Sequence, residues 1–267
     1  MKPGAYQMKK EFITIIGAGW LGRPLCLSFL AQGFEILATT AHDKSEEFAL
    51  DGIPYTSIDV ATQVIPDKII NSDVLIYLIP PLGVSHVKKF FDQIPADKKI
   101  IFASSTSVYG KNMNEVDEDS ELFDCSTGSP ILFETENYLR KRFSNATILR
   151  FGGLYGDKRH PVFFLKGKEE VTGAHELTHL VERTECIDAI TSVLKKGFWG
   201  QTFNIVSDLR MPKKEYYVMM AEKFNLTPPK YNFYERSFKE TNIKNTKSKI
   251  LLGMKYSDPS EFYTSSV

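Results

Sequence analysis

Three glycines near the start of the chain have a spacing that suits phosphate binding. They belong to the segment GAGWLG at 17–22, which follows an apolar run at Phe12–Ile16 and opens a stretch with helical apolar spacing. In such a strand, turn and helix, the first glycine permits a tight turn, the second lets a pyrophosphate approach the backbone, and the third lets helix and strand pack. The helix N-terminus offers free N–H groups to phosphates; a purely structural glycine turn is the alternative. The candidate cofactor-binding residues here are Gly17, Gly19, Trp20, Leu21, Gly22 and Arg23.

The end of the next predicted strand bears on which dinucleotide binds. An NAD site usually has an acid there to accept a hydrogen bond from the ribose 2′-hydroxyl. The strand at Glu35–Thr39 has no acid at its tip, since Glu35 lies too early and Asp43 too late. Nearby side chains that could donate to a 2′-phosphate favour NADP over NAD as the cofactor, with both kept open. These side chains are Thr39, Thr40, His42, Lys44 and Arg23.

A second motif with chemical meaning is HELTH at 175–179. It matches HExxH, in which two histidines one helical turn apart bind Zn²⁺ and the glutamate is a general base. The third ligand is missing, because Glu182 and Glu185 stand where the longer zinc-protease motif has glycine and histidine. A zinc-dependent hydrolase is therefore the less favoured alternative. His175 and His179 are interpreted as ordinary polar or substrate-facing residues, with no metal predicted.

Short continuous apolar runs alternate with amphipathic stretches, as in a parallel sheet that is covered by helices on both faces. This pattern predicts an α/β fold with a doubly wound, Rossmann-like parallel sheet. Helices are expected over Leu21–Leu30, Ile131–Phe143 and Ile187–Lys196. The predicted strands are Phe12–Ile16, Glu35–Thr39, Val74–Leu78, Lys99–Ser104, Ala146–Phe151 and Thr202–Val206.

The pattern changes after Asp208 to short segments rich in Tyr, Lys and Pro, which indicates a small mixed lobe. The acidic segment Glu115–Asp124 is expected to be a solvated loop. The predicted organisation is a flexible tail at 1–8, a dinucleotide-binding core at 9–160 and 181–206, and a small substrate-binding lobe at 161–180 and 207–267.

Composition limits the classes of partner. The 267 residues include 33 Lys+Arg and 33 Asp+Glu, so the net charge is zero, without the basic excess that nucleic-acid or membrane-surface binding needs. The most apolar stretch, 73–84, is too short to span a bilayer and contains Pro80-Pro81. The three cysteines lack disulfide or metal spacing, and the N-terminus lacks an apolar signal segment. A cytoplasmic protein with reduced thiols is expected.

The segment SSTSVYG at 104–110 resembles the SSxxVYG segment of the extended short-chain dehydrogenases/reductases, the nucleotide-sugar epimerase and dehydratase family. Further family landmarks follow in the same order, and the resemblance covers nearly the whole chain from about Lys10. It is strongest to atypical members described as NAD(P)-dependent epimerases, which also carry a GxGxLG turn. These landmarks are the GAGWLG turn, Asp59-Val60, ILRFGGLYG at 148–156, CIDA at 186–189 and FNIVSD at 203–208.

This resemblance implies a Rossmann core with a C-terminal substrate lobe. It places Asp59 at the adenine, with Val60 beside it, and Leu78 at the cofactor at the end of its strand. It also places Ser105 at the family's catalytic serine or threonine position, while Tyr109 belongs to the structural VYG end and is a second catalytic candidate. The ArgHisPro segment at 159–161 resembles the GxRHP segment of the atypical branch; it faces substrate or is a surface loop.

The chain departs from the family at its catalytic pair. The family uses YxxxK, in which a tyrosine exchanges a proton and a lysine holds the nicotinamide ribose. Only Tyr6 has a lysine four residues on, and it precedes the first strand; alignment on Glu136 puts Gly128 and Leu132 in the Tyr and Lys places. Thr106-Ser107 replaces the Asp-Glu of dehydratases, which disfavours dehydration. Tyr138, in the same predicted helix, is a further candidate proton donor.

The function predicted is that of an NAD(P)-binding oxidoreductase or epimerase with non-standard or impaired catalytic residues. Its substrate would be a small hydroxylated or carbonyl compound, with a sugar derivative as one case. A non-catalytic NAD(P)-binding regulatory or interaction protein is the main alternative, and a hydroxyacid dehydrogenase is disfavoured by the short segments after Asp208. Tyr216, Tyr217, Tyr231 and Tyr234 are expected mostly in the core of the lobe, and a homodimer is one option for assembly.

Overall fold

The computed structural model describes residues 11–80, 83–110, 114–122, 129–232 and 241–263. The predicted tail at 1–8 lies outside these residues, as do Gly128 and Tyr234. The helices and strands are β1 (Phe12–Ile16), α1 (Gly22–Ala31), β2 (Glu35–Thr40), α2 (Ser45–Leu50), β3 (Tyr55–Ser57), α3 (Asp67–Ile70), β4 (Val74–Tyr77), α4 (Val84–Phe91), β5 (Lys99–Ser105), η1 (Thr106–Tyr109), β6 (Glu115–Val116), α5 (Pro130–Arg142), β7 (Ala146–Phe151), β8 (Gly153–Tyr155), α6 (Pro161–Leu165), β9 (Leu180–Glu182), α7 (Arg183–Lys196), β10 (Thr202–Ile205), α8 (Lys213–Lys223), β11 (Asn242–Ile243), η2 (Ser248–Leu252) and η3 (Pro259–Glu261).

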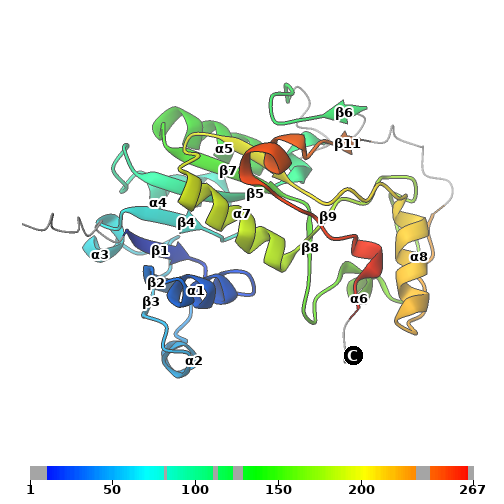
Figure 1. Cartoon of the computed structure of the whole chain (residues 1–267), viewed down its shortest axis with the longest axis horizontal. Helices are drawn as coiled ribbons and strands as arrows, with labels where there is room; N and C mark the ends of the chain where they lie inside the picture. Colours follow the sequence, from blue (N-terminus) through cyan, green and yellow to red (C-terminus); the bar gives the residue numbers. More distant parts are fainter. Residues whose placement is uncertain (1–10, 81–82, 111–113, 123–128, 233–240, 264–267) are drawn as a thin grey trace, which may run out of the picture.

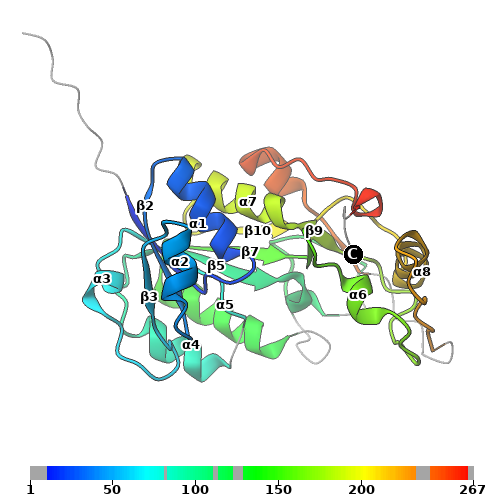
Figure 2. The same cartoon turned by 90° about the horizontal axis from the view of Figure 1, so that it is seen from below.

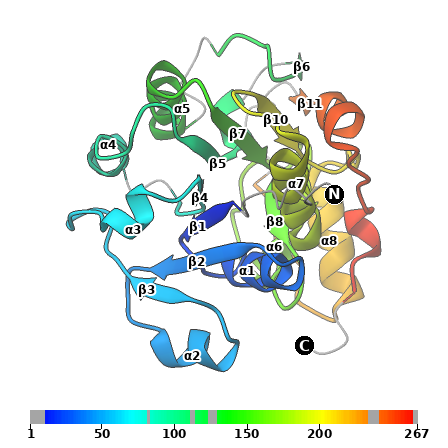
Figure 3. The ribbon, with the colours of Figure 1, turned by 60° about the vertical axis from the view of Figure 1, so that its left-hand side comes forward.

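The central element is a seven-stranded sheet in the order β10-β7-β5-β4-β1-β2-β3. All of its pairs are parallel, so the carboxyl ends of all its strands lie along one edge. The strand order reverses between β1 and β4, because the chain winds from β1 to β3 and then returns to start β4 on the other side (Figure 3). The predicted Rossmann-like α/β fold is confirmed.

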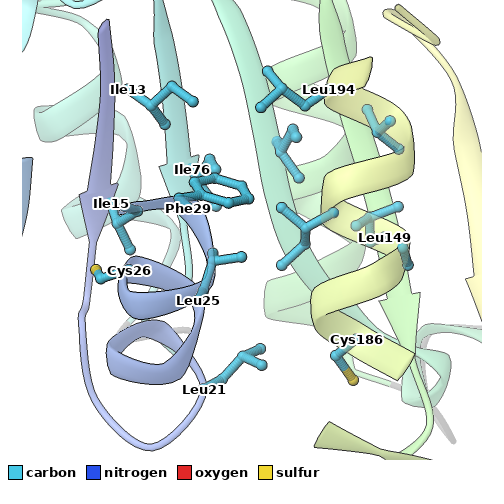
Figure 4. Packing of buried hydrophobic residues seen from close by; sticks show 14 of the residues in the cluster. Ile13, Ile15, Leu21, Leu25, Cys26, Phe29, Ile76, Leu149, Cys186 and Leu194 are labelled. Atoms are coloured by element: carbon cyan, nitrogen blue, oxygen red, sulfur yellow. The ribbon is translucent and has the colours of Figure 1, made fainter. Parts of the chain in front are cut away.

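Helices cover both faces of this sheet (Figures 1 and 2). Alternate strand residues point to opposite faces, so Ile15 of β1 packs in one apolar cluster with α1 and α7, while Ile16 packs in the other with α4 and α5. Figure 4 shows the first cluster, in which Leu25 and Phe29 of α1 lie against the strands. The two faces of the sheet are therefore both buried, as the continuous apolar runs predict.

The predicted strands are all present, with ends that differ by one residue at most. One helix begins clearly earlier than predicted. The helix expected from Ile187 begins one turn earlier, at Arg183, because Glu182 caps the backbone N–H of Thr184 and Glu185 accepts from the N–H of Glu182. This capping box at Glu182 and Glu185 is the sequence signal for the earlier start, and the prediction did not use it.

A separate apolar cluster lies beyond the carboxyl edge of the sheet, around α6 and α8 (Figure 2). Tyr216, Tyr217 and Tyr231 are buried in it, as expected. The helix α8 was not expected, since only short segments were predicted after Asp208. The domain boundaries stay a prediction. Within the described residues, no helix is both long and apolar enough to cross a membrane.

The acidic segment differs from its prediction as a solvated loop. Val116 is buried, in the short strand β6 that pairs with β11. A Glu118 side-chain oxygen accepts a 2.6 Å hydrogen bond from the backbone N–H of Asn204. Since Asn204 lies in the edge strand β10, Glu118 satisfies a donor that the sheet leaves open. The Asp124 end of the segment lies outside the described residues.

Candidate cofactor and substrate site

The predicted cofactor residues meet at the carboxyl edge of the sheet. In open parallel sheets, ligands bind outside the carboxyl ends at the point where the strand order reverses. Here that point lies between β1 and β4, and the GAGWLG turn follows β1 directly. The residues after β2, β3, β4 and β5 lie along the same edge.

The three glycines of the turn occupy three different environments. Gly17 has φ 91°, and a Cβ there would lie 2.8 Å from Ile79 Cγ1. Gly22 is equally tight, since a Cβ would lie 2.7 Å from the Gly17 carbonyl oxygen and 3.3 Å from Leu78 Cδ1. A Cβ on Gly19, in contrast, would meet nothing within 4 Å among the described residues. The middle glycine thus leaves space beside the backbone, where a ligand can approach.

That space adjoins the N-terminus of α1. The first turn of this helix has no side-chain cap and no acidic residue. Uncapped N–H groups and the helix dipole both favour an anion at this point. The turn itself is fixed, because Ala18 N–H donates to the Thr39 carbonyl at 2.8 Å and Gly19 N–H donates to the Gly17 carbonyl at 2.8 Å. The turn therefore leaves both space and uncapped N–H groups at the point where a phosphate could bind.

Several of the predicted 2′-phosphate donors around the tip of β2 are buried or already hydrogen-bonded within the chain. The Thr39 hydroxyl is buried, whereas the Thr40 hydroxyl donates to the His42 carbonyl at 2.6 Å and also contacts Tyr55 Oη at 2.8 Å. Arg23 Nε donates to Asp51 Oδ2 at 2.6 Å, and this hydrogen bond raises the pKa of Arg23. Of the predicted 2′-phosphate donors, Arg23 is therefore already paired with an acid.

The predicted residues after β3 and β4 also lie along the carboxyl edge of the sheet. Asp59 accepts from the N–H of Ala61 and from the Thr62 hydroxyl, and these bonds lower its pKa. Val60 is buried in the core, so only its backbone is available to a ligand. Leu78 lies under the glycine turn, and its backbone N–H donates to the Ile16 carbonyl at 2.8 Å.

Ser105 ends β5, two strands away from β1 in the sheet. Its Oγ accepts a 3.1 Å hydrogen bond from the Ser107 N–H, which caps the short helix η1. A serine hydroxyl that accepts in this way still has its own hydrogen to donate. Ser105 can therefore hydrogen-bond a substrate oxygen from its predicted position.

Tyr109 lies in a buried polar network. Its hydroxyl contacts the Asn204 side-chain oxygen at 2.8 Å and accepts a 2.7 Å bond from Arg150 Nη1. Arg150 in turn pairs with Glu136 at 2.7 Å, and Glu136 also accepts from the Ser104 hydroxyl. Burial raises the pKa of Tyr109 to about 12, although Arg150 opposes the shift. This placement favours a structural role over proton exchange, and the catalytic role stays a prediction.

The other candidates for the missing catalytic pair lie elsewhere. Leu132, which the alignment on Glu136 puts in the lysine place, is 3% exposed and packs in the core between α5 and the sheet. The Tyr138 hydroxyl donates to Asp92 at 2.6 Å, at the C-terminal end of α4, and burial with this bond raises its pKa. Since helices in this fold return toward the amino ends of the strands, Tyr138 points away from the carboxyl edge.

The HELTH segment is not a helix, so His175 and His179 do not share the helix face that zinc binding by HExxH needs. His175 is exposed, whereas the Nε2 atom of His179 is buried with no hydrogen-bond partner in the described structure. Burial, with the charges of Arg210 and Lys213, lowers the pKa of His179 to about 3. No cluster of three potential metal ligands occurs in the described ranges.

The ArgHisPro segment at 159–161 divides between surface and core. His160 is buried, contacts Tyr216 Oη through Nε2 at 2.9 Å, and accepts from the Val162 N–H. Arg159 is exposed and lies beside Trp20, together with Arg183. Arg183 was not among the predicted site residues, because no local sequence signal connects it with the glycine turn.

Comparison with known proteins supports the same architecture. No family model matches the chain. Protein YeeZ of Escherichia coli K12 is 29% identical over 269 residues, which cover 94% of this chain and 97% of YeeZ. A functionally unknown conserved protein from Silicibacter pomeroyi has a TM-score of 0.77 at 18% identity, covering 94% of this chain and 95% of that one. A Bacillus cereus UDP-glucuronic acid 4-epimerase in complex with NAD has a TM-score of 0.73 at 18% identity over 93% of both chains.

At these identities the solved structures establish the fold. The resemblance to the epimerase and dehydratase family is thus confirmed at the level of the fold.

Proposed function

We propose that this chain binds NAD or NADP at the carboxyl edge of its sheet and acts as an oxidoreductase or epimerase on a small hydroxylated or carbonyl substrate. The observation that carries the proposal is the open space at Gly19 beside the uncapped N-terminus of α1, at the strand reversal. A glycine turn with a purely structural role needs no such space at its middle glycine. The pyrophosphate would lie there, held by backbone N–H groups.

The other predicted residues follow from this placement. The adenine would lie near Asp59 and Val60, and the nicotinamide near Leu78 and Ser105. A bound nicotinamide supplies a hydride acceptor or donor at its C4 atom. Ser105 would orient the substrate by donating a hydrogen bond to its hydroxyl or carbonyl oxygen. With no tyrosine and lysine in the usual places, we expect slow proton transfer and a low turnover number.

A sugar derivative is the substrate class that we favour. The B. cereus protein, which shares this fold over most of both chains, is a UDP-glucuronic acid 4-epimerase whose structure is in complex with NAD. A small lobe with its own apolar cluster lies beyond the carboxyl edge in this chain, where it can cover a substrate. The assembly as a homodimer stays a prediction.

The second candidate is a non-catalytic NAD(P)-binding protein. It is supported by one specific observation: Leu132, which the alignment on Glu136 puts in the place of the family's lysine, contributes to the core. A chain that binds the dinucleotide and uses the catalytic corner for packing would respond to the cofactor without transferring hydride.

Two measurements test the proposal. The first is a titration of metal-free protein with NADPH and with NADH, following nicotinamide fluorescence or heat; micromolar binding is expected, and no binding to either would refute the proposal. The second incubates the NAD(P)-bound protein with UDP-sugars and small hydroxylated or carbonyl compounds while nicotinamide absorbance and epimer formation are followed. Binding with no turnover on any compound would favour the non-catalytic candidate.

A further inference from the structure

Two arginines converge on the aromatic residue of the glycine turn. Trp20 lies between the second and third glycines, and the guanidinium carbons of Arg159 and Arg183 each lie 4.9 Å from the centre of its ring. This distance is within the range of a cation–π interaction. Two positive charges are thus placed on the side chain of a residue whose backbone belongs to the predicted phosphate site.

The position of both arginines is fixed by a tight turn. Gly156 and Arg159 exchange two backbone hydrogen bonds, of 2.9 and 3.0 Å, across the residues between them. Gly156 has φ 132°, and a Cβ there would lie 2.7 Å from a Glu182 side-chain oxygen and 3.1 Å from Arg183 Cβ. The turn therefore packs directly on the start of α7, and Arg159 and Arg183 are held next to each other.

Most of the hydrogen-bonding capacity of these arginines is unused. A guanidinium has five N–H donors. Arg183 makes one long contact, 3.5 Å from Nη1 to Asp157 Oδ2, and Asp157 is about half exposed. Arg159 has no carboxylate within ion-pair distance among the described residues. Like charges held together near the positive end of a helix repel one another, and an anion between them would offset that repulsion.

We propose that Arg159 and Arg183 bind the pyrophosphate of the dinucleotide, adding two charged donors to the N–H groups of the glycine turn. The inference rests on the proposed function. The pyrophosphate is favoured over an anionic group of the substrate because the arginines contact the turn itself. Ser105, where the substrate would react, lies two strands away, or about 10 Å at normal strand spacing.

The experiment compares the wild-type chain with Arg159→Gln, Arg183→Gln, the double variant, and Lys158→Gln as the matched control. Lys158 is exposed in the same turn but is not one of the two cations in contact with the Trp20 ring. The Lys158→Gln variant therefore removes the same charge without removing a cation–π contact. The probes are NADH, ADP-ribose and adenosine, titrated at several salt concentrations. Trp20 emission is followed in a Trp199→Phe background, since these are the two tryptophans of the chain.

We expect each arginine variant to weaken NADH and ADP-ribose binding about tenfold, and the double variant about a hundredfold. Adenosine binding should not change, the salt dependence of NADH affinity should become shallower, and Lys158→Gln should match wild type. Wild-type binding with equal NADH affinity in the double variant would overturn this inference and leave the proposed function standing. Failure of wild-type protein to bind NADH, NADPH or ADP-ribose would overturn both.

Discussion

One end of the candidate site is formed by backbone, whereas the other would depend on particular side chains. The phosphate end is made by backbone: a glycine turn, the free N-terminus of α1 and the reversal of strand order. The proposed catalytic end depends in the family that this chain resembles on two particular side chains, and Leu132, which the alignment on Glu136 puts in one of their places, is a core residue here. On the proposed function, cofactor binding and hydride chemistry would be separable in this chain, because one needs a backbone shape and the other needs specific side chains.

Substitution of the glycines tests the phosphate end and has the largest expected effect. Gly19→Val places its side chain in the open space, so dinucleotide binding should fall by at least about a thousandfold while the unfolding transition is unchanged. Gly22→Val is the contrast, since its Cβ would lie 2.7 Å from the Gly17 carbonyl oxygen and should destabilise the fold. The measurements are NADH and NADPH titration with urea denaturation. Normal binding by a folded Gly19→Val protein would remove the phosphate site from this turn.

Leu132→Lys tests the catalytic end. It restores the family's lysine in the sequence, but it introduces an ammonium into a position that is 3% exposed and surrounded by core residues. We expect a loss of about 3 kcal/mol or more in the free energy of unfolding, measured in urea. Leu132→Met, which keeps the volume, should cost less than about 1.5 kcal/mol. A stable Leu132→Lys protein would mean that this corner opens to the site, and would favour the enzyme over the non-catalytic candidate.

The pH dependence of the free energy of unfolding tests the small lobe against the sheet. Burial lowers the pKa of His160 from 6.5 to about 4, so the native lobe holds this residue neutral while the unfolded chain protonates it. Between pH 6.5 and pH 4 the unfolded state binds more protons than the native state. The contribution of His160 to the free energy of unfolding is therefore complete above pH 6.5 and is lost as the pH falls toward 4.

The loss at pH 4 should be on the order of 3 kcal/mol for this one group. His160→Asn, which can still cap the N-terminus of α6, should be less stable at neutral pH and show a flatter dependence below it. The exposed His175→Asn is the control, with no change expected. An unchanged acid transition in His160→Asn would show that other groups, such as His179, dominate it.

The parts of this molecule that local sequence determines were predicted well. The strands follow from apolar runs, and the turn follows from glycines that are needed for steric reasons at Gly17 and Gly22. The helix α8 was missed because its buried Tyr216, Tyr217, Met220 and Ala221, although spaced as one helix face, lie within the continuous apolar run YYVMMA at 216–221, in which no polar residue marks the opposite face. Contacts between distant segments had no local signal at all.

The pairing of Arg23 with Asp51, 28 residues away, is one such contact, and the approach of Arg183 to Trp20 is another. Sequence spacing shows which residues could donate to a phosphate. It does not show which of them are already bound to an acid in the folded chain, and this is the information that coenzyme preference requires.

Asp51→Asn tests that last point and has the smallest expected effect. The absence of an acid at the tip of β2 favours NADP, whereas the bond from Arg23 Nε to Asp51 Oδ2 at 2.6 Å holds the guanidinium in place and balances its charge. With asparagine there, the Arg23 charge becomes available to a 2′-phosphate, and NADPH affinity should rise by roughly threefold to tenfold. NADH has no such phosphate, so its affinity should not change.

The control variant is Glu47→Gln, which removes a longer 3.6 Å contact with Arg23 and should shift NADPH affinity less. Equal changes for NADH and NADPH in Asp51→Asn would place Arg23 away from the adenosine ribose, and coenzyme preference would then depend on the other predicted donors near the tip of β2.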